Sequence, residues 1–328
     1  MGVFLTGATG VLGGRLVERL ADRDHEVIGL VRDDDGAALV EARGGVPRYG
    51  DVLDPGSLER VVQNVAIDTV VHAATALPVK TKPSEAEWAR NDRVRREGAR
   101  NLLAAVDDID RFVFPSVVWI ARRPNGSRFD ESAPRNPDRT TRSAADVKRL
   151  LEDRAADREF DATILRCGFF YAPDAGHTRS WGEALLSGDL PIVGGGLLGR
   201  RNVILAFLHA EDAARAVADA IEANATGCYH VVDDRPVPLA EFLTEFADRL
   251  DTSEPSRIPG WLARFFVGKE TVDMLTNPMA TSAERFERDV GWKPVYPTYE
   301  AGLPQVVETW RTDGSLRETA EGYEWAGD

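Results

Sequence analysis

A short apolar strand, a glycine-rich turn and an amphipathic helix open the chain, and this unit constrains the fold more than any other stretch. Residues 3–5 form the strand, and Gly7, Gly10 and Gly13 follow it. Apolar residues then recur at helical spacing, at Val11, Leu12, Leu16, Val17 and Leu20. In such a unit the first glycine permits the tight turn, the second lets the backbone approach a pyrophosphate, and the third lets the helix pack close to the strand. The unit predicts a dinucleotide site at the N-terminus of this helix.

Strands and helices alternate through the rest of the first half. The predicted strands are residues 26–31, 46–50, 68–74, 111–115 and 161–166, and the helices between them include 95–106 and 144–158. Such alternation predicts an α/β fold in which a doubly wound parallel sheet is covered by helices on both faces. Ligands of these sheets bind beyond the C-terminal ends of the strands, where the strand order reverses.

The pattern changes after residue 168, which predicts a second domain. We expect a dinucleotide-binding domain at 1–168, rejoined by about 206–232, and a smaller C-terminal α/β substrate-binding domain made of 169–205 and 233–311. Residues 121–143 are rich in Arg, Pro, Asn, Asp and Ser, which predicts a loop over the sheet edge and a candidate lid. The tail at 312–328 is polar and is expected to be loosely held.

Composition narrows the class of protein. The chain has 328 residues, of which 43% are hydrophobic, so it is globular with ample core. A net charge of −14 and a pI of about 4.9 argue against nucleic-acid binding through a basic face. No apolar run is long enough to span a bilayer, and the first strand begins too soon after Met1 for a signal peptide, so we expect a cytoplasmic protein. Cys167 and Cys228 are too few for a disulfide framework or a zinc site, and no metal is expected.

Six segments in order resemble the extended short-chain dehydrogenases/reductases, the NAD(P)-dependent epimerase/dehydratase group. The matching segments are the phosphate loop at 6–13, the adenine segment at 50–52, the ribose and nicotinamide turn at 72–74, and residues 166–173, 207–212 and 291–294. The resemblance implies a Rossmann-type domain and a homodimer formed through the helices that carry Arg95 and Lys148. It also implies cofactor contacts at Gly7, Thr9, Gly10, Val11, Leu12, Gly13, Asp51, Val52, Ala73, Ala74 and Lys148.

The end of the second strand bears on the choice of cofactor. Members that prefer NAD place an acidic residue there to bind the ribose 2′-hydroxyl. This chain has Val31 at that position, followed by Arg32. A cation suits the 2′-phosphate of NADP, so we expect NADP. Asp33, Asp34 and Asp35 stand close by and would weaken the attraction, which leaves NAD open.

The acid–base residues of the resembling family are incomplete in this chain. The family uses a Tyr and a Lys four residues later on one helix face, and Lys148 fits the lysine position. The tyrosine position holds Ala144, which cannot transfer a proton. The Ser/Thr at the end of the fifth strand corresponds to Val117, or to Ser116 if the register is shifted by one residue. The position of a helper Asn holds Arg95, and Asn91 lies one turn further back.

Three residues are candidates for the missing proton donor, and each has an alternative role. Tyr171 carries a phenol near the expected nicotinamide end, but a packing role fits its place in the matched segment. His177 titrates near neutral pH, or is an exposed loop residue. Lys148 acts as an acid or an electrostatic stabiliser if it is desolvated, or binds the ribose alone. We take Lys148, Ser116 and Tyr171 as the candidate catalytic set.

Several other side chains are expected in local roles. Ser143 and Asp146 are placed to form a capping box at the start of the lysine-bearing helix, and Asp212 is expected to cap its own helix. Four aromatic residues indicate either an apolar substrate pocket or an inter-domain core: Trp119, Phe169, Phe170 and Trp181.

The retained cofactor residues and the missing acid favour an atypical reductase. We expect it to bind NADP and transfer a hydride to or from the carbonyl or hydroxyl group of a small metabolite. Two alternatives stay open. One is a non-catalytic NADP-binding sensor or scaffold, and the other is a nucleotide-sugar epimerase or dehydratase with relocated catalytic groups.

Overall fold

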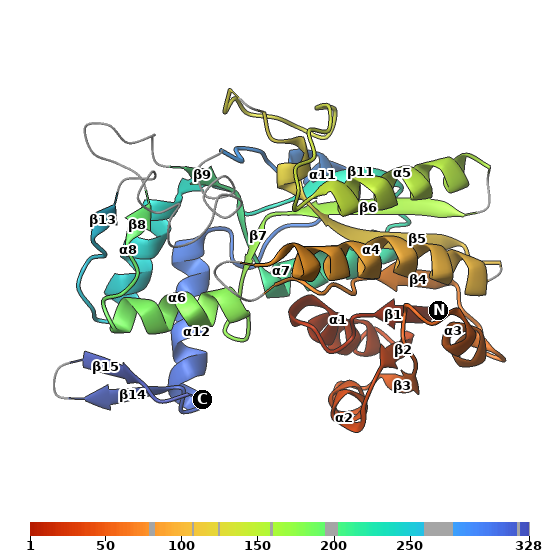
Figure 1. Cartoon of the computed structure of the whole chain (residues 1–328), viewed down its shortest axis with the longest axis horizontal. Helices are drawn as coiled ribbons and strands as arrows, with labels where there is room; N and C mark the ends of the chain where they lie inside the picture. Colours follow the sequence, from red (N-terminus) through yellow and green to blue (C-terminus); the bar gives the residue numbers. More distant parts are fainter. Residues whose placement is uncertain are drawn as a thin grey trace.

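A seven-stranded parallel sheet forms the centre of the first half of the molecule (Figure 1). The computed structural model describes residues 1–78, 83–106, 108–123, 125–157, 160–193, 203–258, 278–319 and 322–327. Within these ranges we find no helix whose length and apolar character would suit a membrane span. The sheet order is β11-β6-β5-β4-β1-β2-β3. The strands are β1 (Gly2–Thr6), β2 (Glu26–Val31), β3 (Val46–Tyr49), β4 (Thr69–His72), β5 (Arg111–Val117), β6 (Asp161–Cys167) and β11 (Gly227–Val231).

Helices cover both faces of this sheet, which confirms the predicted doubly wound arrangement. They are α1 (Val11–Ala21), α2 (Asp34–Glu41), α3 (Pro55–Val62), α4 (Glu85–Ala105), α5 (Arg142–Ala156) and α7 (Ala210–Glu222). The helix α1 packs on α2 and α7, whereas α4 packs on α3 and α5. Because β1 lies between β2 and β4, the strand order reverses at β1. The glycine-rich turn therefore follows the strand at which such sheets bind their ligands.

A second hydrophobic core lies beyond the C-terminal ends of these strands (Figure 1). It is built from α6 (Gly176–Leu186), α8 (Leu239–Arg249), α12 (Tyr299–Thr312) and the short strands β7 (Phe169–Tyr171), β8 (Ile192–Val193), β9 (Ile204–Leu205), β10 (Phe207–His209), β12 (Val237–Pro238) and β13 (Arg257–Ile258). The 3-10 helix η1 (Val118–Ala121) carries Trp119, which packs against both cores. The expected second domain includes 194–202 and 259–277, which lie outside the described residues.

Two segments differ from their predicted organisation. The helix α11 (Glu284–Val290) lies within the range assigned to the second domain, but its Phe286 packs on Tyr229 in the first core. The tail is not loosely held, because β14 (Leu316–Thr319) and β15 (Gly322–Trp325) form an antiparallel hairpin. The Trp325 ring packs edge-on against Trp310 at 5.2 Å between centroids, so buried apolar contacts hold the tail.

Both predicted helix caps are wrong. The helix α5 starts at Arg142, and Ser143 is buried inside its first turn. Its entry is shaped by Asp138, whose Oδ1 accepts the backbone N–H groups of Thr140 and Thr141 at 2.9 and 3.1 Å. Asp212 is fully buried and instead accepts the N–H groups of Val295 and Tyr296 at 2.7 and 2.8 Å. Its carboxylate therefore fixes a distant loop, and His209 caps α7.

Candidate active site

Backbone proximity explains the spacing of the three glycines. Gly7 has a left-handed φ of +76°, and a Cβ there would lie 2.7 Å from the backbone nitrogen of Ala74. A Cβ on Gly13 would overlap the carbonyl group of Gly7. Gly10 has only the Gly7 carbonyl oxygen near its Cβ position, at 3.3 Å, and is exposed. The turn is therefore tight on its inner side and open where a ligand would approach.

The N-terminus of α1 is free to bind an anion. Its first N–H groups have no helical partner, and the structure gives α1 neither a side-chain cap nor an acidic residue in its first turn. Side chains cap three other helices of the same domain, α2, α3 and α4, through Asp33, Asp54 and Ser84. The open end of α1, reached past exposed Thr9 and Gly10 and formed by Val11, Leu12 and Gly13, fits a pyrophosphate.

The C-terminal end of β4 is locked to this turn through His72. The His72 Nε2–H donates to the carbonyl oxygen of Arg95 at 3.2 Å, so Nδ1 accepts from the Thr6 hydroxyl at 2.8 Å. Burial lowers the pKa of His72 to about 4, which keeps the ring neutral. The N–H of Ala74 donates to Thr6 Oγ1 at 3.4 Å. Ala73 and Ala74 are thereby held beside the glycine-rich turn, as the cofactor hypothesis requires.

The adenosine side of the predicted site gathers around the ends of β2 and β3. Val52 is buried, and its carbonyl oxygen accepts from Asn101 Nδ2 at 2.9 Å. Asp51 is exposed beside it and accepts the N–H of Leu53 at 2.9 Å. Arg32 follows β2 and is also exposed, with no ion pair to any described residue. Its charge is available to a ligand.

The ends of β5 and β6 bring Ser116 beside Arg166. These residues are register partners on adjacent parallel strands, so their side chains point to the same face of the sheet. Ser116 is 6% exposed and Arg166 is 2% exposed. Arg166 Nη1 contacts His230 Nε2 at 3.3 Å, and burial lowers the pKa of His230 to about 3, which leaves a neutral imidazole as the acceptor.

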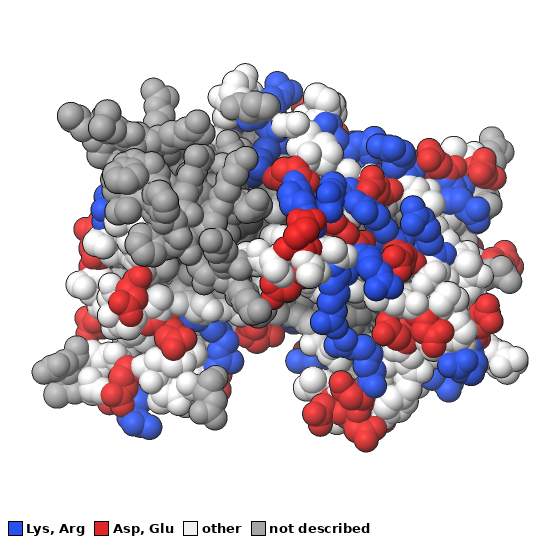
Figure 2. Space-filling model, viewed as in Figure 1, with Lys and Arg blue, Asp and Glu red and all other residues white. Residues whose placement is uncertain are grey.

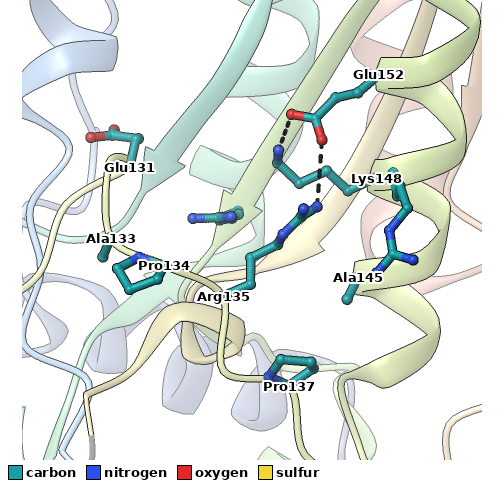
Figure 3. A pocket seen from close by; sticks show the side chains of 10 residues that line it. Glu131, Ala133, Pro134, Arg135, Pro137, Ala145, Lys148 and Glu152 are labelled. Carbon is teal, nitrogen blue, oxygen red and sulfur yellow. Dashed lines mark hydrogen bonds and ion pairs between the residues drawn. The ribbon is translucent and has the colours of Figure 1, made fainter.

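Lys148 lines a cavity of about 490 Å³ between α5 and residues 131–137 (Figure 3). Its Nζ is paired with the carboxylate of Glu152, one turn later on α5, and Arg135 contacts the same carboxylate at 3.4 Å. Glu131 and Arg166 also line the cavity, but no residue of the glycine-rich turn does. The structure therefore places Lys148 near Arg166, in a cavity that the glycine-rich turn does not line, and its contact with a cofactor stays a prediction.

The other proposed proton donors are engaged elsewhere. Tyr171 is fully buried in the second core, its hydroxyl donates to the carbonyl oxygen of Thr298 at 3.4 Å, and burial raises its pKa well above the usual value. His177 donates from Nε2 to the carbonyl oxygen of Phe170, and burial lowers its pKa. Ala144 is fully buried in α5. These placements favour a packing role for Tyr171.

An aromatic cluster stands beyond the ends of β5 and β6. Phe169 stacks on Trp181 with an interplanar angle of 7° and a centroid distance of 5.5 Å. Trp119 packs against the same ring at 6.3 Å, and His177 meets its face edge-on at 4.7 Å. Phe169 is nearly buried, but Trp119 and Trp181 are half-buried. The cluster is apolar, as predicted, and it joins the two cores.

Two polar side chains of α4, both singled out in the sequence without an assigned role, are buried near the end of β4. Asn91 is fully buried, and its Oδ1 accepts the N–H of Ala76 at 3.0 Å while its Nδ2 has no partner among the residues that the structure describes. Arg95, one turn later, is 6% exposed. The sequence indicates Arg95 as a charged residue at the position of the helper Asn in the resembling family.

Comparisons with known proteins agree with this geometry. The model of the NAD dependent epimerase/dehydratase family matches residues 3–232. A Streptomyces protein, 3-diazoavenalumate denitrifying reductase, is 35% identical over 315 residues, which cover 92% of this chain and 99% of the relative. A Stigmatella aurantiaca protein, 4-hydroxy-2-methyl-3-oxo-4-farnesyl-3,4-dihydroquinoline-1-oxide ketoreductase, is 28% identical over 253 residues, which cover 74% of this chain and 72% of the relative.

Solved structures share the fold at lower identity. Human epimerase family protein SDR39U1, solved with NADPH, aligns with a TM-score of 0.76 and 19% identity over 94% of this chain and 99% of that one. The Thermus thermophilus UDP-glucose 4-epimerase, solved with NAD, aligns with a TM-score of 0.76 and 24% identity over 95% and 99%. The parallel sheet, the open glycine-rich turn and the family match lead to one conclusion: the chain belongs to the NAD dependent epimerase/dehydratase family.

Proposed function

We propose that this protein is an NADP-dependent reductase that acts on a small molecule whose reduction needs no proton from the protein. The observation that carries the proposal is the contrast between an open dinucleotide turn and the buried Ala144 at the position of the acid. When bound, the nicotinamide group supplies a hydride. The chain's own residues then bind and orient, and none of them has to deliver a proton.

The cofactor residues fit a dinucleotide phosphate. The uncapped N-terminus of α1 faces open space past Gly10, and Gly7 and Gly13 have no room for a side chain. Arg32 offers an unpaired cation at the end of β2, where the 2′-phosphate of NADP would lie. The NADPH in the human structural neighbour and the NAD in the Thermus one are consistent with either nucleotide. The free charge on Arg32 favours NADP. Lys148 reaches the ribose only if its pairing with Glu152 is released.

The acceptor that best fits a missing acid is a diazo group, as in the name of the Streptomyces relative. Reducing a carbonyl makes an alkoxide that must be protonated, which is the usual task of the tyrosine. Replacing a diazonium group by hydrogen makes a carbon–hydrogen bond from the hydride and breaks the carbon–nitrogen bond. The bonding electron pair leaves with dinitrogen, so no proton is consumed. Such a reaction does not need a proton donor at the position of Ala144.

A carbonyl acceptor is the second candidate. The ketoreductase from Stigmatella is related over three quarters of the chain, and Ser116 lies at the end of β5 with a hydroxyl able to bond a carbonyl oxygen. Solvent would then have to supply the proton. The alcohol product would take up a proton from the solvent, whereas the product of the diazonium reaction would take up none.

Isotope tracing separates these candidates. The protein is incubated with NADPH deuterated at C4, on either face, and with benzenediazonium, benzaldehyde, acetophenone or UDP-glucose. With deuterated NADPH in H₂O, we expect deuterated benzene and dinitrogen from the diazonium ion. With ordinary NADPH in D₂O, the benzene should carry no deuterium. We expect no turnover of the other three compounds. The Gly10→Val variant should not bind NADPH, so any product it gives measures reduction without the predicted site. Gly56→Val, at the start of α3 and outside the glycine-rich turn, is the matched glycine control.

Other outcomes would replace the proposal. Turnover of the aldehyde or ketone alone, with the nicotinamide deuterium on the carbinol carbon of the product, would favour the carbonyl reductase. Interconversion of UDP-glucose would favour an epimerase with relocated groups. Tight NADPH binding without turnover of any acceptor would favour a sensor or scaffold.

Homodimerisation through α4 and α5 is a further proposal. Figure 2 shows basic and acidic side chains mixed over these two helices, and the charged residues between them include Arg96, Arg100, Asp146, Arg149 and Asp153. An interface on this face would depend on ion pairs, which salt screens. Light scattering should therefore give a dimer mass that falls toward 36.0 kDa as salt is raised. A monomer at every salt concentration would exclude it.

A further inference from the structure

The buried cations of the described residues differ in how they are neutralised. Arg111 and Arg122 have carboxylate partners, Asp161 at 3.7 Å and Asp138 at 2.6 Å. Lys148 is paired with Glu152, as Figure 3 shows, and Arg166 contacts the imidazole of His230. Arg95 has neither a carboxylate nor an imidazole. Its one side-chain hydrogen bond in the described structure runs from Nη1 to the carbonyl oxygen of Thr140 at 3.5 Å.

Arg95 lies on the part of α4 that contacts the C-terminal end of β4. Its own carbonyl group accepts from His72 at the end of β4, and Asn91 one turn earlier contacts the N–H of Ala76. Both side chains therefore start from the part of α4 that borders the turn at Ala73 and Ala74. The free Nδ2 of Asn91 and the guanidinium of Arg95 are donors without a strong acceptor in the same region.

The Arg95 side chain also reaches Thr140, just before α5, which carries Ala144 at the position of the tyrosine. Asp92 pairs with Arg142, and Arg96 pairs with Asp146 at 2.7 Å, so α4 and α5 run side by side in the same direction. Between these two contacts, Arg95 on α4 and Ala144 on α5 are both buried. Ala144 itself is packed in the first hydrophobic core.

An unpaired buried guanidinium is costly for folding. Burial lowers the pKa of Arg95 to about 10, so the group still carries its charge at neutral pH. The negative charge of Asp92 partly offsets this burial, but Asp92 Oδ2 binds Arg139 and Arg142, at 2.8 and 2.9 Å, and no ion pair joins Asp92 to Arg95 within the described residues. A charge left unpaired at such a cost, at the end of the central strands, is the kind of group that binds a ligand of opposite charge.

We propose that Arg95, with the amide of Asn91, binds a carboxylate of the substrate and so selects acidic substrates. A guanidinium presents parallel N–H donors that match the two oxygens of a carboxylate. This assignment rests on the proposed reductase function for its place in a catalytic cycle, but not for the binding itself. It gives Arg95 a substrate-binding role in place of a structural one.

Binding of benzoate, measured by calorimetry with and without saturating NADP⁺, tests this assignment. Benzamide is the uncharged probe of the same shape. We expect Arg95→Met to weaken benzoate binding about 10–100-fold, the size of a lost charged hydrogen-bond pair, and to leave benzamide unchanged. Arg95→Lys should retain part of the affinity. Arg93→Met, on the exposed side of the same helix, is the matched control and should bind like the native protein.

Thermal unfolding adds a readout that a structural role would move the other way. Removing an unpaired buried charge should leave the Tm of Arg95→Met unchanged or raised. A lower Tm with unchanged benzoate affinity would overturn the proposal and make Arg95 structural. A matching loss of NADP⁺ affinity would assign the guanidinium to a cofactor phosphate instead. If the native protein bound benzoate but no NADP⁺, the reductase proposal would fail while the carboxylate site stood.

Discussion

The turn after β1 and the start of α5 both border the candidate site, but different forces determine their residues. The turn is constrained by its own backbone, because Gly7 and Gly13 have no space for a Cβ. At α5 the position expected to hold a tyrosine holds Ala144, and the charges around it depend on contacts with α4. The predicted cofactor turn is thus determined by local backbone geometry, whereas the residues expected at the reacting end depend on side chains brought together by the fold.

The largest expected effect comes from inserting a side chain between the glycine-rich turn and α1. In Gly13→Val the new side chain would overlap the Gly7 carbonyl group, so strand and helix must separate. We expect the free energy of unfolding to fall by about 3 kcal/mol or more. Urea unfolding measures it. Gly56→Val, whose Cβ would make an ordinary 3.5 Å contact, should lose about 1 kcal/mol or less. Equal losses in the two variants would break the contrast.

Acid should weaken the contact between the turn and β4. The pKa of His72 is about 4 in the folded chain because of burial, and near 6.5 when the chain unfolds. The unfolded state therefore binds the proton first, and stability is full above about pH 6.5 and falls as the pH drops toward 4. At pH 5 the loss is about 2 kcal/mol from this residue. Urea unfolding at pH 7 and pH 5 should show a smaller difference in His72→Gln than in the native protein. An identical difference would remove His72 from the account.

Arg32 should set the choice between nicotinamide nucleotides without affecting the fold. Arg32→Ala removes an exposed cation, so the ratio of NADP to NAD affinity should fall about tenfold, as expected for one charged hydrogen bond. Calorimetry with both nucleotides measures the ratio. Arg60→Ala, on exposed α3, is the control. A native protein that already prefers NAD would contradict the assignment of NADP.

The smallest effect is expected at Tyr171. Its hydroxyl makes one long bond to a carbonyl oxygen inside the second core, so Tyr171→Phe should cost less than about 1 kcal/mol in stability. Turnover in steady-state assays should change less than twofold, because the buried phenol is bonded to the carbonyl oxygen of Thr298 and we expect it to have a packing role. A drop in kcat of a hundredfold or more would restore Tyr171 to the catalytic set.

The glycine-rich turn could be predicted from the sequence because its causes are local. The roles of Gly7, Gly10 and Gly13 follow from strand, turn and helix signals within eleven residues, and the structure has the same close approaches. The parallel sheet followed in the same way from alternating apolar segments. The polar tail was misjudged, because Leu316 and Trp325 become buried only against a core formed by distant residues.

The contacts of the candidate catalytic residues could not be predicted in this way, because they depend on which helices and loops pack together. The Lys148–Glu152 spacing was visible, but the Arg135 contact with the same Glu152 carboxylate depends on how the loop before α5 folds back on that helix. Asp212 was expected to cap a helix, yet its partners lie more than eighty residues later. Arg95 lacks an ion-pair partner among the described residues because of how α4, α5 and β4 pack together. The spacing of residues along the chain does not reveal this packing.

Calorimetric titration of the native protein and of Gly10→Val with NADPH and NADH tests the central claim most directly. The account predicts that the native protein binds NADPH more tightly than NADH, and that Gly10→Val keeps its Tm but loses both, because its side chain occupies the open approach to the N-terminus of α1. A folded native protein that releases or takes up no heat with either nucleotide, and shows no competition between them, would contradict it.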